Sequence, residues 1–209
     1  MSFSTASIDA LREKIRASMS ERRFTHTAEV EKMAIRLGEL YIPEKIEVLR
    51  VAALLHDVTK ERSADEHFEI LKAHGGEISE LDRLSPKTLH ARTAALVIKD
   101  EYSEFATEEV VNAVLHHTTG DAEMTVVDMI VYLADYIDMS RSFPDCVFLR
   151  EYFWDKEPQN MPQNERYSHL LRTLVLSFDL TLKALVEENS PISVQTVEVR
   201  NAILCKLNG

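Results

Sequence analysis

The segment LLHDVTK, residues 54–60, places His56 and Asp57 side by side at the end of an apolar run, with Lys60 three residues later. The pair follows Ala53 by three and four residues and therefore flanks the apolar stripe of one predicted helix. A buried carboxylate without a partner costs several kcal/mol, so it must be paired, protonated or bound to a metal. Imidazole and carboxylate groups together suit iron, manganese or zinc.

Three other predicted helices direct a histidine or an aspartate toward the interior. His26 lies on the same helix face as the apolar residues that follow it, and His117 lies three residues after Val114. Asp135 lies four residues after Val131 in the most apolar segment of the chain. If the four helices bring these groups together, they could surround one divalent cation, which would offset the cost of burying them.

Each of these residues also has a purely structural interpretation. A lone histidine on a helix face is more often a satisfied core or surface residue than a ligand, and this applies to His26, His90 and His117 taken singly. Lys60 alone is typical of a solvated lysine at a helix end, and Asp135 alone could form a cap or a salt bridge. Three more histidines in polar stretches are predicted to be solvated at the surface: His67, His74 and His169. Only the joint pattern favours a metal site.

Apolar residues recur at steps of three and four along most of the chain, which predicts an all-α bundle. The chain contains only 5 Gly and 6 Pro residues, and no segment resembles a strand pair. Ser85 is predicted to cap one helix with Pro86 in its first turn, and Gly120 to end the next. The predicted helices cover residues 8–15, 22–41, 43–53, 61–76, 85–102, 107–120, 125–138, 167–188 and 192–204. Of these, the helix at 125–138 is expected to be central.

The composition changes after the central helix. Three prolines and several Asn and Gln residues lie within about 142–166, which predicts a loop with a short helix inside it. We therefore expect a single domain spanning residues 1–209, with this loop-rich segment and a C-terminal helical extension.

The chain is acidic, with 24 Lys and Arg against 35 Asp and Glu, a formal net charge of −11 and a pI of about 5.2. Nucleic-acid binding usually needs a basic face, so it is not expected here, although a locally positive site could still bind a small anion. No apolar run is long enough to predict a membrane span or a signal peptide. Cys146 and Cys205 lie far apart and are expected to be reduced thiols of a cytoplasmic protein.

The ordered set of a histidine, an HD pair, two further histidines and an aspartate on successive helices resembles the HD-domain superfamily of metal-dependent phosphohydrolases. The motifs RRFTHT, ALLHDVTK, KTLHARTAAL, HHTTG and MTVVDMIVYLADYID together resemble the YqeK family of symmetrical bis(5'-nucleosyl)-tetraphosphatases. The resemblance runs from about Arg23 to Pro144 and resumes in TVEVRN near the C-terminus. The motifs from HTTG to ADYI are its specific part.

The resemblance implies an HD-domain helical bundle that holds a divalent metal, iron in that family, with manganese or another transition metal as the alternative. The implied metal ligands are His26, His56, Asp57 and Asp135. The implied nucleotide contacts are Arg23, Lys60, His90, His117 and Arg141. His90 and His117 could instead hold a second metal. The implied ligand is a dinucleoside polyphosphate or its ADP product, and a homodimer is compatible with the sequence.

The chain departs from the family pattern in places. DMSR, residues 138–141, stands where the family usually has Glu-Pro-Gly/Asn-Arg, and SVQT, residues 193–196, lacks the usual His-Pro before the threonine. Residues 148–166 look longer than usual. In HHTTG the family histidine is the one before TTG, His117, and helical phase also favours it over His116. The metal ligands therefore transfer better than the nucleotide specificity.

The implied reaction is symmetrical cleavage of diadenosine tetraphosphate into two ADP by a metal-bound hydroxide. In this hypothesis Asp57 ligates the metal and orients the water, while Lys60 and two arginines neutralise charge on the phosphate oxygens. A phosphohydrolase acting on nucleoside mono- or triphosphates is the first alternative, because DMSR is altered. The second is a non-catalytic nucleotide or metal sensor, and the third is a helical interaction protein, which leaves the inward HD pair unexplained.

Overall fold

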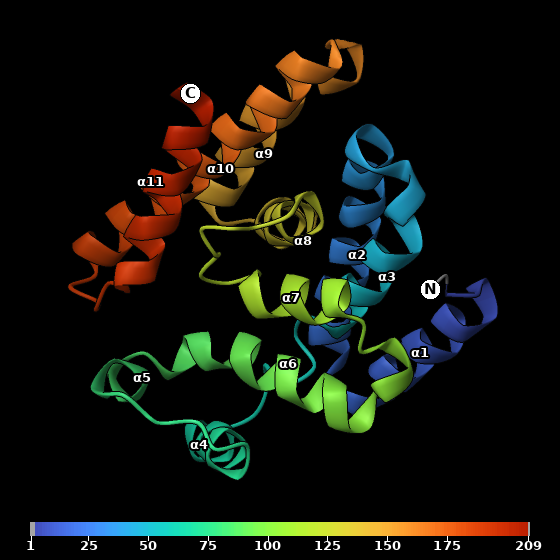
Figure 1. The fold of residues 1–209 in the computed structure, drawn as a ribbon, viewed down its shortest axis with the longest axis vertical. Helices are drawn as coiled ribbons and strands as arrows, with labels where there is room; N and C mark the ends of the chain where they lie inside the picture. The colour runs from blue at the N-terminus through green and yellow to red at the C-terminus, as the bar shows by residue number, and fades with distance from the viewer. Residues whose placement is uncertain (1–2, 209) are drawn as a thin grey trace.

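The computed structural model describes residues 3–208, and within that range it contains helices and no strand (Figure 1). This confirms the all-α prediction. The α-helices are α1 (Thr5–Ser18), α2 (Glu21–Tyr41), α3 (Ile46–Leu55), α4 (Ala64–Ala73), α5 (Glu80–Leu84), α6 (Leu89–Glu101), α7 (Glu108–His116), α8 (Val126–Ile137), α9 (Pro144–Trp154), α10 (Gln163–Glu187) and α11 (Val194–Asn208). Among the described residues, no helix combines the length and apolar character needed to cross a membrane.

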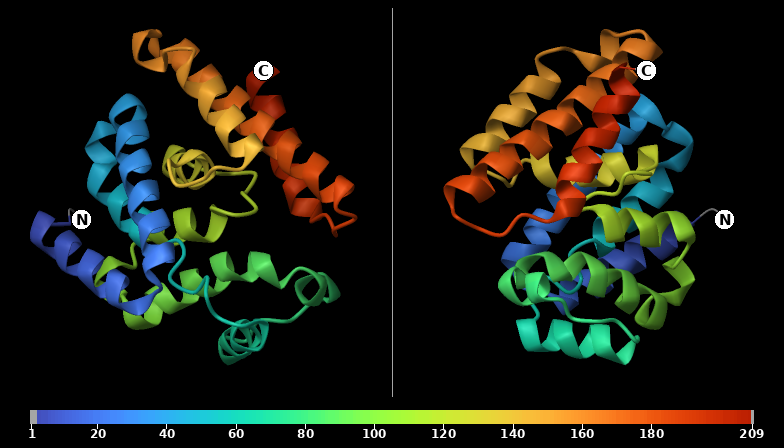
Figure 2. Two further views of the ribbon diagram at one scale, coloured as in Figure 1. Left: turned by 180° about the vertical axis from the view of Figure 1, so that it is seen from behind. Right: turned by 60° about the vertical axis from the view of Figure 1, so that its left-hand side comes forward.

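Helix α8 lies at the centre of the molecule, as its apolar sequence predicted. It contacts α2, α3 and α7 on one side and α9 and α10 on the other, and it is seen end-on between these groups in Figure 2. Most of its side chains are buried, including the fully buried Ile130, Leu133 and Ile137. The helix begins in a capping box between Thr125 and Asp128, which fixes its start and therefore the direction of each later side chain.

The start of α6 differs from the prediction. Ser85 makes no side-chain capping bond, and Pro86 instead begins a short 3-10 turn, Pro86–Thr88, that leads into α6. By contrast, Thr107 caps the start of α7, where its side chain accepts a hydrogen bond from the Val110 amide.

The segment at 142–166 contains a helix, α9, as expected, but the loop expected around it is smaller because a 3-10 turn and the start of α10 also lie within it. Helix α9 covers eleven of its residues and buries Leu149 and Phe153 against the core. The three prolines misled the prediction because each lies at a helix start: Pro144 begins α9, Pro158 begins a 3-10 turn and Pro162 caps α10. Helices α9, α10 and α11 then lie side by side (Figure 2).

Two of the three histidines expected at the surface are buried. His67 is 4% exposed, with Nδ1 2.8 Å from Thr93 Oγ1, and His169 is 4% exposed, with Nε2 3.0 Å from the Phe153 carbonyl oxygen. Each is a single inward-facing residue in a mainly polar stretch, so the local composition predicted exposure and not burial. His74 is exposed, as predicted, and bonds to Asp100.

Gly120 lies in the connection between α7 and α8 and packs against α10 and α11. Its φ of +72° lies in the left-handed region, and an added Cβ would lie 2.9 Å from both Phe178 Cζ and Val199 Cγ1. Its carbonyl oxygen accepts a hydrogen bond from Gln195 Nε2 at 2.7 Å. The glycine of the HTTG motif is therefore required both by the backbone conformation and by the close approach of α10 and α11.

We expect Gly120→Ala to lower the free energy of unfolding by about 2–3 kcal/mol, because backbone strain and overpacking add at this position. Gly75→Ala is the matched control, since Gly75 has the same φ of +72° but an added Cβ meets nothing within 4 Å. It should cost only about 1 kcal/mol. Denaturant unfolding of both variants measures the difference, and equal losses would contradict the packing argument.

Candidate metal centre

Five helices bring histidine and aspartate side chains into one cluster in the interior. His26 comes from α2, His56 and Asp57 follow the end of α3, Asp135 comes from α8, and His117 follows the end of α7. The sixth member is His90, from the start of α6. All are buried except Asp135, whose side chain is 17% exposed. The convergence expected from the helix faces is present for His26, His56, Asp57, His117 and Asp135, and His90, which only the resemblance implied, joins them.

The cluster has a first group of donors around Asp57 Oδ2 and Asp135 Oδ1. His26 Nε2 lies 2.9 Å from Asp135 Oδ1, and His56 Nε2 lies 3.4 Å from Asp57 Oδ2. The two nitrogens also lie 3.7 Å from the opposite carboxylate in each case. Donor atoms of His26, His56 and Asp57 all lie within 4.8 Å of one another. This spacing and this donor chemistry fit a divalent cation.

Three of the histidines are oriented by backbone carbonyls. Nδ1 of His56 donates to the Ala53 carbonyl oxygen at 2.7 Å, and Nδ1 of His117 donates to that of Val114 at 2.6 Å. His90 makes the same contact with the carbonyl oxygen three residues before it, at 2.8 Å. Each Nε2 lone pair is thereby directed into the cluster, as in ligating histidines. Within residues 3–208, the buried Nε2 of His56 has no hydrogen-bond partner, which marks it as an open ligand position.

Asp57 also belongs to a second donor group on its other oxygen. Asp57 Oδ1 lies 3.4 Å from His90 Nε2 and 3.8 Å from His117 Nε2, and the two nitrogens lie 2.9 Å apart. Thr118 Oγ1 lies within 3.1 Å of both. His117, and not His116, joins this group, since His116 Nδ1 lies 3.5 Å from Asp128 Oδ2 instead. One carboxylate therefore faces two separate sets of imidazoles.

Three cations surround the cluster. Arg23 Nη1 lies 2.7 Å from Asp57 Oδ2, and Arg141 Nη2 lies 2.5 Å from Asp135 Oδ1. Lys60 Nζ lies 3.1 Å from His90 Nε2. Each cation was a predicted nucleotide contact, and each is within reach of an anion bound at the cluster.

The surroundings favour the protonation states that bind a metal: ionised carboxylates for Asp57 and Asp135 and a neutral imidazole for His117. Burial would raise the pKa of Asp57, but His56 and Lys60 hold it well below its usual range, and Arg141 does the same for Asp135. Burial lowers the pKa of His117 to about 4, so its imidazole is neutral near pH 7. His26 is the exception: burial lowers its pKa, yet hydrogen bonds to Asp135 and Asp138 raise it to about 9.

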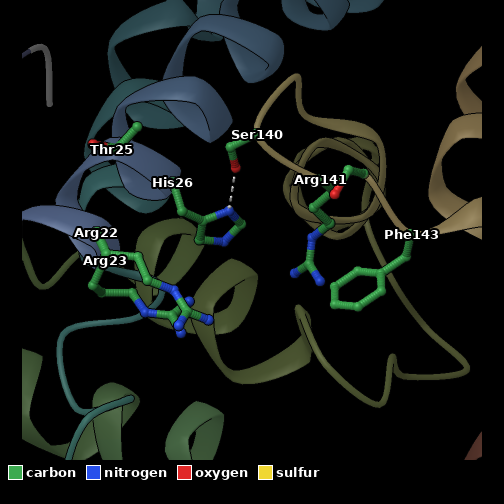
Figure 3. A pocket seen from close by; sticks show the side chains of 8 residues that line it. Arg22, Arg23, Thr25, His26, Ser140, Arg141 and Phe143 are labelled. Atoms are coloured by element: carbon green, nitrogen blue, oxygen red, sulfur yellow. Dashed lines mark hydrogen bonds between the residues drawn. The ribbon is translucent and has the colours of Figure 1, made fainter.

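The sequence reasoning missed the part that Asp138 plays beside His26. Asp138 is fully buried, with Oδ2 3.3 Å from His26 Nδ1, and Ser140 Oγ lies 3.1 Å from the same nitrogen (Figure 3). A carboxylate on the outer nitrogen fixes the ring orientation and raises the basicity of the inner one. Asp138 was noticed only as a departure in DMSR, because it follows the end of α8, where helical spacing no longer indicates direction.

Arg150 of α9 holds this segment in place. Its guanidinium donates to the carbonyl oxygens of Ile137 at 2.8 Å and of Asp138 and Arg141 at 2.6 Å each. A single side chain therefore fixes the turn that carries Asp138 and Arg141.

A helical bundle whose interior holds an HD pair among further histidines and an aspartate is the architecture of an HD phosphohydrolase. Residues 23–140 match the family model described as HD domain, and the chain belongs to this family.

The similar proteins agree with this class. A symmetrical bis(5'-nucleosyl)-tetraphosphatase of Halalkalibacterium halodurans is 28% identical over 192 residues, which is 91% of this chain and 93% of that protein. The protein of the same name from Bacillus subtilis is 26% identical over 182 residues, 87% of this chain and 89% of its own. A crystal structure described as a predicted HD superfamily hydrolase involved in NAD metabolism, from Clostridium acetobutylicum, matches with a TM-score of 0.79 and 27% identity, covering 99% of this chain and 100% of that one.

We expect Asp138→Asn to weaken binding of a divalent transition metal by about 10- to 100-fold, because His26 loses the carboxylate that orients it. Asp155→Asn, at an exposed position after α9, is the control and should leave affinity unchanged. Titration of metal-free protein with manganese measures both. Equal affinities of the two variants would contradict the assigned contact.

Metal affinity should also depend on pH through His26. Its pKa of about 9 means that the imidazole carries a proton at pH 7, and a metal must displace that proton. The apparent affinity should therefore rise about tenfold per pH unit from about pH 7 upward and level off near 9. Calorimetry in buffers of different ionisation enthalpy counts the released proton, and a pH-independent affinity would argue against this state of His26.

Proposed function

We propose that this HD phosphohydrolase cleaves dinucleoside tetraphosphates symmetrically, releasing two nucleoside diphosphates, with diadenosine tetraphosphate giving two ADP. The observation that carries the proposal is the set of three cations, Arg23, Lys60 and Arg141, around a buried cluster of metal-ligand types. A polyphosphate is the ligand class that needs both a divalent cation and several fixed positive charges. The names of the similar tetraphosphatases support the same substrate.

In this proposal one divalent ion, iron in preference to manganese, is held by His26, His56, Asp57 and Asp135. Such an ion supplies Lewis acidity, which lowers the pKa of a water to roughly 7 and draws charge from a phosphoryl oxygen. The donor set is two imidazoles and two carboxylates, which suits both metals. His90 and His117, with Asp57 Oδ1, form the site of a second metal or bind a phosphate directly.

The side chains then divide the work on the substrate. Asp57 contributes one oxygen to each donor group, so it positions the ligands held by both groups relative to the reacting phosphorus. Lys60 and Arg141 lie on the side of His117 and Asp135, where their charges neutralise the phosphate oxygens as negative charge develops. Water adds across the central P–O–P bond, its oxygen joining one phosphorus and its proton reaching the other product, so that two nucleoside diphosphates form.

The activity test uses diadenosine tetraphosphate with iron or manganese under reducing conditions in H₂¹⁸O. We expect ADP as the sole nucleotide, with one ¹⁸O atom in the β-phosphate of one of the two ADP molecules. ATP plus AMP would exclude symmetrical cleavage. Nucleoside mono- and triphosphates and NAD complete the panel, NAD because the similar clostridial protein is described as involved in NAD metabolism.

Asp57→Asn should reduce kcat/KM by about a thousandfold, equivalent to about 4 kcal/mol, because both donor groups lose a charged oxygen. The amide has the size of the carboxylate, so the fold should persist. Full activity of a correctly folded Asp57→Asn variant would remove this site from the reaction.

A further inference from the structure

Two pockets reach the metal centre from different sides. We call the first the arginine pocket: it has a volume of about 520 Å³ and is lined by Arg22, Arg23, His26, Ser140, Arg141 and Phe143 (Figure 3). We call the second the lysine pocket: it has a volume of about 400 Å³ and its lining includes Lys60, His117, Thr118 and Asp135. Arg141 and Phe143 line both, so they form the wall that the pockets share.

The arginine pocket is positively charged in a chain whose net charge is −11. Three of its lining residues are arginines, and none of its lining residues is an aspartate or glutamate. Arg23 and Arg141 pair with Asp57 and Asp135. Arg22 is exposed and forms no hydrogen bond or ion pair within residues 3–208, and in Figure 3 its side chain extends beside that of Arg23. Its charge is therefore available to an anion.

An aromatic ring stands at the edge of the same pocket. Phe143 is 67% exposed, although it lies in the short connection between α8 and α9, and in Figure 3 its ring lies beside the Arg141 side chain across from Arg22 and Arg23. An exposed aromatic face beside fixed positive charges is the arrangement that binds a nucleotide by stacking and ion pairing together.

We propose that the arginine pocket binds the second nucleoside diphosphate half of the substrate, with Arg22 on its phosphates and Phe143 stacked on its base, while the lysine pocket holds the first half. This inference rests on the proposed function. A symmetrically cut dinucleoside tetraphosphate places equal halves on either side of the reacting phosphorus, and pockets of similar volume on two sides of one metal centre match that requirement. Arg22 and Phe143 thereby become specificity residues that favour a substrate with two nucleosides.

The test is calorimetric titration of the metal-loaded full chain with ADP. Wild-type protein should bind two ADP per chain. The double variant Arg22→Glu/Phe143→Ala should weaken the site in the arginine pocket at least about tenfold, since that site loses one ion pair and one stacking contact. The other site should change less, since Phe143 lines the lysine pocket but Arg22 does not. The KM of the double variant for diadenosine tetraphosphate should rise by a similar factor. The variant Arg22→Glu/Phe143→Tyr keeps an aromatic ring and should therefore recover the part of the ADP affinity that depends on stacking.

The matched control is Arg172→Glu/Phe148→Ala, which changes an exposed arginine and a 50% exposed phenylalanine that line neither pocket. It should bind two ADP as the wild type does. One ADP per wild-type chain, or two unchanged sites in the pocket variant, would overturn the proposal. Because binding is measured without turnover, two ADP sites in a protein that leaves diadenosine tetraphosphate intact would refute the proposed activity and leave the second subsite standing.

Discussion

The structure depends on two carboxylates placed inside a helical bundle among imidazoles. Asp57 is almost fully buried, and each oxygen faces a different group of histidines. An isolated carboxylate in such a place would be protonated or would destabilise the fold. Arg23 pairs with Asp57 and Arg141 pairs with Asp135. His56 and Lys60 hold the pKa of Asp57 low, and Arg141 does so for Asp135, so both charges persist. A shift of any helix that contributes to the cluster would therefore break these contacts and leave a buried charge without a partner.

The position of α8 determines where several residues of the site lie. Its capped start fixes the direction of Asp135, and the turn after its end supplies Asp138, Ser140 and Arg141. Arg150 binds three carbonyl oxygens of that turn, so α9 sets where Arg141 lies. Arg141 in that turn lines both the arginine pocket and the lysine pocket. Asp138, which lies beside the cluster, and Arg141, which lines both pockets, are therefore neighbours in sequence.

Helical periodicity predicted the bundle and the inward direction of most cluster residues, because an apolar stripe indicates which side chains face inward while a helix lasts. His90 was implied only by the family resemblance. Prediction failed where that rule ends. Asp138 lies beyond α8, and the buried His67 and His169 sit in stretches whose polar composition conceals one inward position. The loop content of residues 142–166 was overestimated because the prolines of this segment lie at helix starts and not within loops. The pairing of Arg23 with Asp57, and the division of the imidazoles into two groups, needed coordinates, since no local pattern encodes contacts between distant helices.

Anomalous diffraction from crystals of the iron-loaded protein would show whether these four side chains hold the cation. We expect a peak bonded, at about 2–2.3 Å, to nitrogens of His26 and His56 and to carboxylate oxygens of Asp57 and Asp135. A protein that binds no iron at this cluster, or that holds it elsewhere while these four side chains keep their metal-free contacts, would rule out the cluster as the metal site.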